Sequence, residues 1–524
     1  MVRKLVSAAC LAALLALPAA AQPSPAASPR PAEQAQTAPP SRPQQGATGQ
    51  EITGRRLPPD VTTVHTLDLP DGRTLRFSAT AGALPLVDPQ GAVQAELGYV
   101  AYTALDTNPA TRPVTFFLNG GPGASSAYLH LLVAGPWRLP LGQSSISPSQ
   151  SPALVPNLET WLDFTDLVFL DPVETGYSRA TGSRDEIRDR YFTVDGDVSS
   201  IAAAIARWLR TNDRLASPKF FVGESYGGFR GPLVAQKLQK DLGIGLSGVI
   251  LLSPVLDFGM LGQPRHNPME FVTRLPSFAA AKLERDGVSD RKALADAERY
   301  AGGEYLVDLT RGMQDQDAIA RIAARVAELT GLDKDLVRRH AGRIGLGTFQ
   351  REFQRGDGKI ASAYDTGVTT FDPDPTDDRG SGSDGVLTAM QAPLSTAMVD
   401  HLSRTLGWRV PNQRYELLNN SVSPNWRYGR GRTSPQVMDE LKETLALDPD
   451  LRVLVAHGLT DLVTPYFASE LLLRQLPAYG GKSRAALTTY PGGHMFYTRD
   501  ASRAAFRKDA EKLITGRTEK GERG

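Results

Sequence analysis

Cysteine is almost absent from this chain of 524 residues: Cys10 is the only one, so no disulfide can form within the chain. An excess of charge of one sign is also missing, because 58 basic residues are matched by 57 acidic ones. The basic residues form no cluster, which argues against nucleic acid or a membrane surface as a partner. A chain of this length can bury a large core without covalent cross-links.

The N-terminus has the three parts of a secretory signal peptide. Residues 1–4 include two basic side chains, residues 5–17 are apolar, and residues 18–21 are a proline and three alanines that suit cleavage before Gln22. The apolar stretch is too short to span a bilayer as a stable helix. We therefore predict a signal peptide over residues 1–21 and export of the mature chain.

Cys10 lies inside this segment, and Ser7 stands where a lipoprotein signal has leucine, so we expect no lipid anchor. Export without any disulfide favours a bacterial periplasm or exterior over a eukaryotic secretory compartment. Residues 22–50 are rich in Pro, Ala, Gln and Ser and too poor in apolar side chains to pack, which predicts a disordered linker.

The pattern Gly-x-Ser-x-Gly occurs once, at residues 223–227. An apolar run at 220–222 predicts a strand before it, and the run at 233–238 predicts a helix after it. This is the context of a nucleophile elbow, in which a tight strand-to-helix turn exposes a serine hydroxyl and the flanking glycines avoid a Cβ clash. Ser225 is therefore the candidate nucleophile.

The partners that a serine nucleophile requires follow in the order typical of this turn, acid and then histidine. Asp461 comes after a predicted buried strand at 451–456, and His494 comes after another at 486–490. Both are expected at the strand-end edge where open α/β sheets carry their chemistry. In this interpretation His494 takes the proton of the Ser225 hydroxyl, and the Asp461 carboxylate orients and stabilises the imidazole.

Two other residues compete for these roles. His457 also follows a strand, but it precedes Asp461 and so breaks the chain order, which favours a structural role. Asp257 follows a predicted strand at 248–252, where some hydrolases carry the acid. We favour Asp461, because it leaves a short connection to the histidine loop.

A glycine-rich loop after the predicted strand at 114–118 supplies the last part of the site. Its sequence, Asn-Gly-Gly-Pro-Gly-Ala-Ser-Ser at 119–126, lets the backbone approach a substrate closely. The backbone amides of Gly121 and Tyr226 are the candidate oxyanion-hole donors. A phosphate-binding loop is disfavoured, because no Lys-Ser or Lys-Thr follows and Gly-x-Gly-x-x-Gly is absent.

Four segments, in this order, resemble signatures of the serine carboxypeptidase family. They are Leu-Asn-Gly-Gly-Pro-Gly-Ala-Ser-Ser at 118–126, Leu-Asp-Pro-Val-Glu-Thr-Gly-Tyr-Ser at 170–178, Gly-Glu-Ser-Tyr-Gly-Gly at 223–228, and the loops around Asp461 and His494. The resemblance extends from about Ile52 to the C-terminus. It implies an α/β-hydrolase fold and a peptidase that cleaves C-terminal residues from peptides, with no cofactor or metal.

The resemblance also implies how the substrate is recognised. In that family the Asn of the first signature and the Glu before the nucleophile bind the substrate's terminal carboxylate, roles that map onto Asn119 and Glu224. A second family Glu is Val133 here, and a family Cys is Ala124, which weakens the inference of an acidic working pH and of strict exopeptidase action. The alternatives are an esterase or acyltransferase on the same triad and an inactive relative that binds peptides.

The remaining pattern predicts one large α/β domain interrupted by an insertion. Alternating runs within 60–105 predict an antiparallel hairpin at the edge of a mostly parallel central sheet. Residues 51–259 and 436–516 form the predicted α/β-hydrolase core, and amphipathic runs within 260–435 predict an inserted helical cap. The Gly-, Asp- and Pro-rich stretch 356–385 is expected to be a mobile loop rather than a calcium site.

Export can be tested on the chain expressed with its own N-terminus. We expect the mature protein to begin near Gln22, without a lipid, because cleavage follows the small residues before it. Its stability should not respond to a reductant, because no cysteine remains. Mass spectrometry of the purified protein checks both points, and an intact Met1 or a lipid on Cys10 would contradict them.

Overall fold

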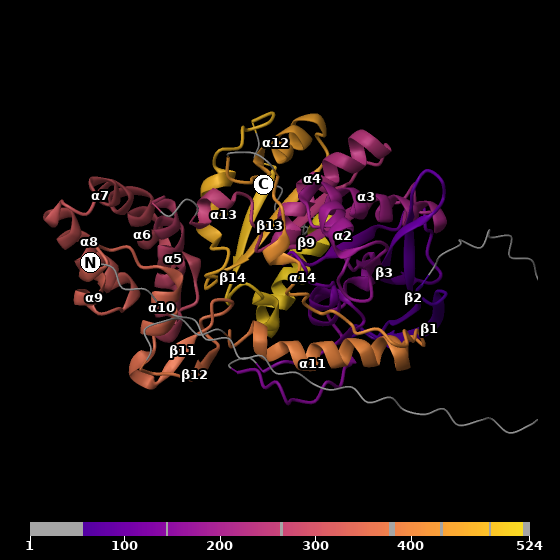
Figure 1. Cartoon of the computed structure of the whole chain (residues 1–524), viewed down its shortest axis with the longest axis horizontal. Coiled ribbons are helices and arrows are strands. Elements are labelled where there is room, and N and C mark those ends of the chain that lie inside the picture. The colour runs from indigo at the N-terminus through magenta and orange to yellow at the C-terminus, as the bar shows by residue number, and fades with distance from the viewer. Residues whose placement is uncertain are drawn as a thin grey trace, which may run out of the picture. The chain divides into compact units, whose positions relative to one another are not determined.

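The computed structural model describes residues 56–142, 145–262, 266–376, 383–429, 433–481 and 484–516 (Figure 1). The predicted signal peptide, residues 1–21, and the predicted linker, residues 22–50, lie outside the described residues. Residues Ile52–Gly524 form one compact unit. Within the described part of this unit, no helix is both long enough and apolar enough to cross a bilayer.

A central sheet organises the unit, with strand order β1-β2-β3-β7-β4-β9-β10-β13-β14 and β8 paired to β3. The pairs from β7 to β14 are parallel, whereas β1, β2 and β3 pair antiparallel with one another, which confirms the predicted mostly parallel sheet with an antiparallel N-terminal edge. The strands are β1 (Val61–Asp68), β2 (Thr74–Val87), β3 (Val93–Ala104), β4 (Val114–Leu118), β7 (Asp166–Leu170), β8 (Arg179–Ala180), β9 (Lys219–Glu224), β10 (Gly248–Leu252), β13 (Arg452–Gly458) and β14 (Ala485–Tyr490).

Both faces of the parallel strands are buried, because successive side chains point to opposite faces and helices cover each face. Phe116 and Phe221 belong to a core shared with α2 (Arg184–Tyr191), α3 (Val194–Thr211), α4 (Tyr226–Leu242) and α12 (Met438–Leu447). Their neighbours Phe117 and Phe220 belong to the opposite core, with α1 (Ala127–Leu129), α11 (Leu387–Asp400) and α14 (Asp500–Thr515). The sheet is therefore the middle of three layers.

The expected insertion at 260–435 divides into two parts. Its first part is a helical block with a core of its own, which also takes in residues of α13 (Tyr466–Leu473); Figure 1 shows this block to the left of the sheet. The block contains α5 (Met269–Arg285), α6 (Ala295–Tyr300), α7 (Leu306–Arg311), α8 (Gln316–Thr330), α9 (Lys334–Arg339) and α10 (Leu346–Glu352). The second part, including α11, packs in the sheet's own core instead.

The stretch that was expected to be a mobile loop contains a short antiparallel pair, β11 (Lys359–Ala361) with β12 (Thr369–Phe371). Another short pair, β5 (Trp137–Arg138) with β6 (Val155–Pro156), lies elsewhere in the chain. Residues 377–382 lie outside the described residues. Residues 362–368, which we call the strap, join β11 to β12 and include buried Ala363 and Asp365.

The strap packs directly on the loop that carries His494. The amide of His494 donates to the carbonyl oxygen of Tyr364 at 2.5 Å. A Cβ on Gly493 would overlap that same oxygen, so only glycine fits beneath the strap. Arg499, just beyond the loop, binds Asp365 of the strap at 2.5 Å and Glu284 of α5 at 2.7 Å. The helical block is thereby tied to the sheet through a largely buried ion cluster.

Removal of Arg499 tests this tie. Arg499→Met leaves the carboxylates of Asp365 and Glu284 without their cation, so we expect the free energy of unfolding to fall by about 3 kcal/mol. The matched control is Arg404→Met, which breaks a pair with Asp400 on a side chain that is 73% exposed and should cost less than about 1 kcal/mol. Urea denaturation followed by tryptophan fluorescence compares the two, and equal losses would contradict the prediction.

Candidate active site

Ser225 lies in the turn between β9 and α4, with φ of 59° and ψ of −119°. A non-glycine residue with this backbone is strained and persists only where its surroundings enforce it. The glycines on either side of Ser225 have no room for a side chain. A Cβ on Gly227 would lie 2.6 Å from the carbonyl oxygen of Leu118, and a Cβ on Gly223 would overlap the carbonyl oxygen of Gly227. The pentapeptide therefore forms the sharp turn that its pattern predicts.

The glycine-rich loop after β4 lies against this turn. A Cβ on Gly120 would stand 2.5 Å from the amide nitrogen of Tyr226, so the two backbones touch. Tyr226 is the first residue of α4, and its amide therefore has no intrahelical acceptor. Gly121 follows with φ of 97°. The loop thus brings Gly120, the residue before Gly121, against the amide of Tyr226, and the oxyanion-hole assignment of Gly121 and Tyr226 stays a prediction.

The second family-like segment braces this loop. The carboxylate of Asp171 accepts hydrogen bonds from the amide of Ser126 at 2.8 Å and from its hydroxyl at 2.7 Å. The hydroxyl of Ser178 donates to the carbonyl oxygen of Asp171 at 2.7 Å. All three residues are buried. The segment at 170–178 therefore acts on the site by fixing the glycine-rich loop.

His494 and Asp461 are hydrogen-bonded, with 2.8 Å between Nδ1 and Oδ2. Asp461 also accepts from the backbone amides of Val463 and Thr464 and from the Thr464 hydroxyl. Burial by itself would lower the pKa of His494, but the adjacent Asp461 carboxylate outweighs it, so the pKa is raised above its ordinary value. The carboxylate thus holds the imidazole and favours its charged form.

Strand β10 connects this pair to the elbow. The amide of Ser225 donates to the carbonyl oxygen of Leu252, the last residue of β10, at 2.9 Å. The next residue, Ser253, donates its hydroxyl to the carbonyl oxygen of His494 at 2.8 Å. Ser225 and His494 are therefore hydrogen-bonded to two consecutive residues, Leu252 and Ser253, at the carboxyl edge of the sheet.

The two competing residues have other contacts. His457 is fully buried, its Nε2 is 2.8 Å from the hydroxyl of Ser469, and burial lowers its pKa to about 4. Asp257 accepts from the amide of Gly259 at 2.7 Å and caps the short helix Phe258–Leu261. These contacts suit structural roles, and the catalytic assignment of Asp461 and His494 stays a prediction.

Glu224, which precedes the nucleophile, is 2% exposed, and both of its carboxylate oxygens have donors. The amide nitrogen of Asn119 donates to Oε2, and the hydroxyl of Tyr497 donates to Oε1 at 2.7 Å. Burial raises the pKa of Glu224 to about 7, which outweighs the lowering by His494 and by these two donors. Sequence patterns missed Tyr497, because nothing local links two positions that are 273 residues apart.

Val133, the position of the family's second Glu, is fully buried in the helical turn His130–Ala134. It offers Glu224 no side-chain donor. No group of three or more His, Cys, Asp or Glu side chains in the described part of the chain is arranged to hold a metal ion.

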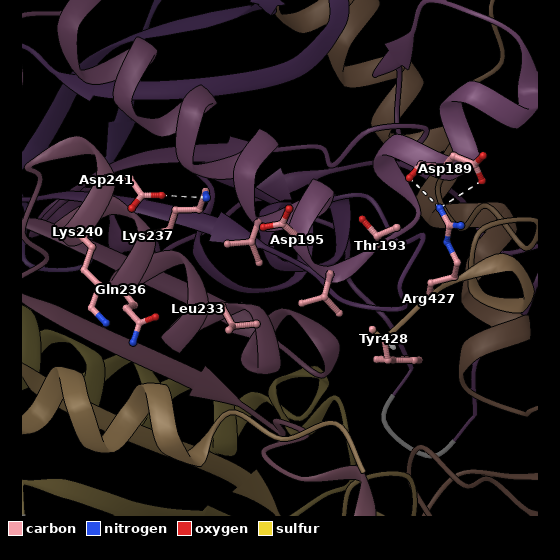
Figure 2. A pocket seen from close by; sticks show the side chains of 13 residues that line it. Asp189, Thr193, Asp195, Leu233, Gln236, Lys237, Lys240, Asp241, Arg427 and Tyr428 are labelled. Atoms are coloured by element: carbon pink, nitrogen blue, oxygen red, sulfur yellow. Dashed lines mark hydrogen bonds and ion pairs between the residues drawn. The ribbon is translucent and has the colours of Figure 1, made fainter. Parts of the chain in front are cut away.

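A separate pocket of about 580 Å³ lies along the outer face of α4 (Figure 2). Figure 2 shows two ion pairs among its side chains, Lys237 with Asp241 at 3.0 Å and Arg427 with Asp189 at 3.2 Å. Its lining contains neither Ser225 nor His494. The pocket is thus distinct from the candidate active site.

Part of the chain is similar to proteins of a known family. The model of the serine carboxypeptidase family matches residues 72–260. Serine carboxypeptidase-like 13 of Arabidopsis thaliana is 33% identical over 156 residues, which are 29% of this chain and 34% of that protein. The pheromone-processing carboxypeptidase KEX1 of Yarrowia lipolytica is 23% identical over 378 residues, 71% of this chain and 53% of that protein. The matches span about a third to a half of these relatives' length.

A solved structure shows the same fold over most of the chain. The prohormone-processing carboxypeptidase Kex1 from Saccharomyces cerevisiae superposes with a TM-score of 0.54 at 16% identity, covering 84% of this chain and 91% of that one. The family match includes the glycine-rich loop and the elbow, and the superposition extends the fold beyond them. The chain therefore has the α/β-hydrolase fold, and its residues 72–260 are similar to the serine carboxypeptidase family.

Proposed function

We propose that this chain is an exported serine-type carboxypeptidase that removes C-terminal residues from peptides. The observation that carries the proposal is the buried His494–Asp461 pair, which is hydrogen-bonded through Ser253 to the end of β10 that also holds the amide of Ser225 in its strained turn. The family match over residues 72–260 supports the same chemistry. Export rests on the predicted signal peptide alone.

The mechanism follows from these positions. The Oγ of Ser225 attacks the carbonyl carbon of the last peptide bond while Nε2 of His494 takes the hydroxyl proton. The backbone amides of Gly121 and Tyr226 hold the oxyanion. The C–N bond then breaks, His494 gives its proton to the leaving amine, and a water activated by His494 hydrolyses the acyl-enzyme. Asp461 keeps Nδ1 protonated throughout and stabilises the imidazolium.

Recognition of the terminal carboxylate is assigned to Asn119 and Glu224. Two close carboxylates repel, so Glu224 can bind the substrate's carboxylate only while it carries a proton. A pKa of about 7 makes that possible at neutral pH, although Val133 replaces the second Glu of the family. The partners are therefore peptides with a free C-terminus.

Two other functions use the same fold. An esterase or acyltransferase would use the same triad without needing the terminal carboxylate, and cleavage of blocked dipeptides against simple esters distinguishes it. An inactive relative would bind peptides without an acyl-enzyme. The strained Ser225 turn and the paired His494 favour an active enzyme, and labelling of Ser225 by a fluorophosphonate would exclude the inactive form.

Substitution of the triad tests the mechanism. Ser225→Ala and His494→Ala should each lower kcat by about 10⁶-fold, and the double variant should be little worse, because the residues act as one unit. Asp461→Asn should cost about 10⁴-fold, because the histidine loses its tautomer. Asp257→Asn is the matched control and should be nearly neutral. A larger loss for Asp257→Asn than for Asp461→Asn would show that the acid is misassigned.

The pH dependence tests carboxylate recognition. Glu224 is protonated below its pKa of about 7 and loses the proton as the pH rises, so kcat/KM for free-acid peptides should fall through that pH. A C-terminal amide can donate to the ionised group, so amidated peptides should show a weaker fall and a difference of about tenfold or more. Glu224→Gln should keep free-acid cleavage above pH 7. Equal cleavage of both substrates at every pH would give Glu224 a structural role.

A further inference from the structure

Glu224 is enclosed by neutral donors where the family resemblance leads one to expect a second carboxyl group. Its Oε1 accepts from the Tyr497 hydroxyl at 2.7 Å, and Tyr497 is itself fully buried. Its Oε2 accepts from Asn119, whose own Oδ1 is fixed by the backbone amide of Leu129 at 3.1 Å. The carboxylate therefore cannot rotate without giving up both bonds, and Tyr497 fixes one of its two oxygens.

A phenol differs from a second carboxyl group in its charge. Burial raises the pKa of Tyr497 further above its ordinary value, so its hydroxyl remains a neutral donor at any working pH. A donor to the ionised carboxylate favours that form, whereas a second carboxylate would repel it. Loss of the proton from Glu224 is therefore easier beside Tyr497 than it would be beside a carboxyl group.

The remaining groups around Glu224 come from several elements. The charges that act on it are His494, which lowers its pKa, and Asp461, which raises it. Burial raises the pKa of Tyr128 and of Tyr364, and the nearby Glu224 carboxylate adds to that rise. Tyr497 is distinguished from these two tyrosines by its direct hydrogen bond to the carboxylate.

We propose that Tyr497 is a positioning residue that fixes Glu224 for recognition of the substrate's terminal carboxylate and sets the pH above which that recognition fails. The proposal rests on the proposed function, because it deepens the role of Glu224. Tyr497 touches Glu224 and acts through it. Its removal is therefore expected to move a pH profile rather than to abolish turnover.

The test is Tyr497→Phe, which deletes one hydroxyl and keeps the ring. Without this donor the ionised form of Glu224 loses stabilisation, so the protonated form should persist to higher pH. The fall in kcat/KM for a free-acid peptide should move up by about one to two pH units, the equivalent of one hydrogen bond to a charged group. Most of the change should appear in KM. For the amidated peptide, the profile should move much less.

The matched control is Tyr490→Phe, which removes a phenol that donates to Asp509 at 2.6 Å, away from Glu224. This variant should not change the pH at which kcat/KM for the free-acid peptide falls. In a Glu224→Gln background, Tyr497→Phe should not move the pH profile, because the carboxyl group that Tyr497 acts on is gone. A Tyr497→Phe variant that loses kcat/KM by the same factor at every pH would overturn the proposal and leave Tyr497 a packing role.

A second substitution works in the opposite direction and does not depend on how well the phenylalanine variant folds. Site-specific replacement of Tyr497 by 3-fluorotyrosine makes the phenol a stronger hydrogen-bond donor. The fall in kcat/KM for the free-acid peptide should therefore move to lower pH. A shift upward, or none, would contradict the proposal. If wild-type protein cleaves free-acid and amidated peptides equally, the carboxylate role of Glu224 fails instead, so the two failures are distinguishable.

Discussion

The close contact between the elbow and the glycine-rich loop is the constraint on which the rest of the site depends. Gly120 and Gly227 bring two backbones so near that a Cβ on either would meet a backbone atom at 2.5–2.6 Å. This contact holds Ser225 in its strained backbone and sets Gly120 against the amide of Tyr226. It also places Asn119 next to Glu224, so the candidate nucleophile, the candidate oxyanion donors and the proposed carboxylate site share one framework.

The histidine side of the site depends on a second constraint, supplied by the insertion. The strap lies over Gly493 and accepts the backbone hydrogen of His494, and Arg499 ties the strap to α5. The inserted block therefore contributes to the position of the imidazole as well as standing between the nucleophile and the acid in the chain. A displacement of the block would therefore shift His494 through the strap and the Arg499 ion pairs.

Burial, rather than a counter-ion, sets the protonation of Glu224. Glu224 has neutral donors on both oxygens, and its pKa of about 7 results mainly from desolvation. Asp461 is satisfied by two backbone amides, a hydroxyl and the imidazole. Because Glu224 lacks the backbone donors that Asp461 has and is deeply buried, it can carry a proton at neutral pH.

The sequence by itself determined the features that depend on neighbours along the chain. The strand, glycines and helix around Ser225 are a local pattern, and so are the strand ends that carry Asp461 and His494, because periodicity and glycine spacing reflect backbone geometry. The antiparallel edge and the helical block were predictable for the same reason. The order of nucleophile, acid and histidine then placed all three at one edge of a parallel sheet.

Only the tertiary structure decided which distant groups meet. The Tyr497–Glu224 bond joins positions 273 residues apart, and the strap reaches His494 from within the insertion. The division of residues 260–435 into a helical block and a part packed in the sheet's core, which includes α11, likewise depends on which apolar surfaces pack together. Such long-range contacts depend on how the whole chain packs, and the spacing of residues along the sequence does not predict them.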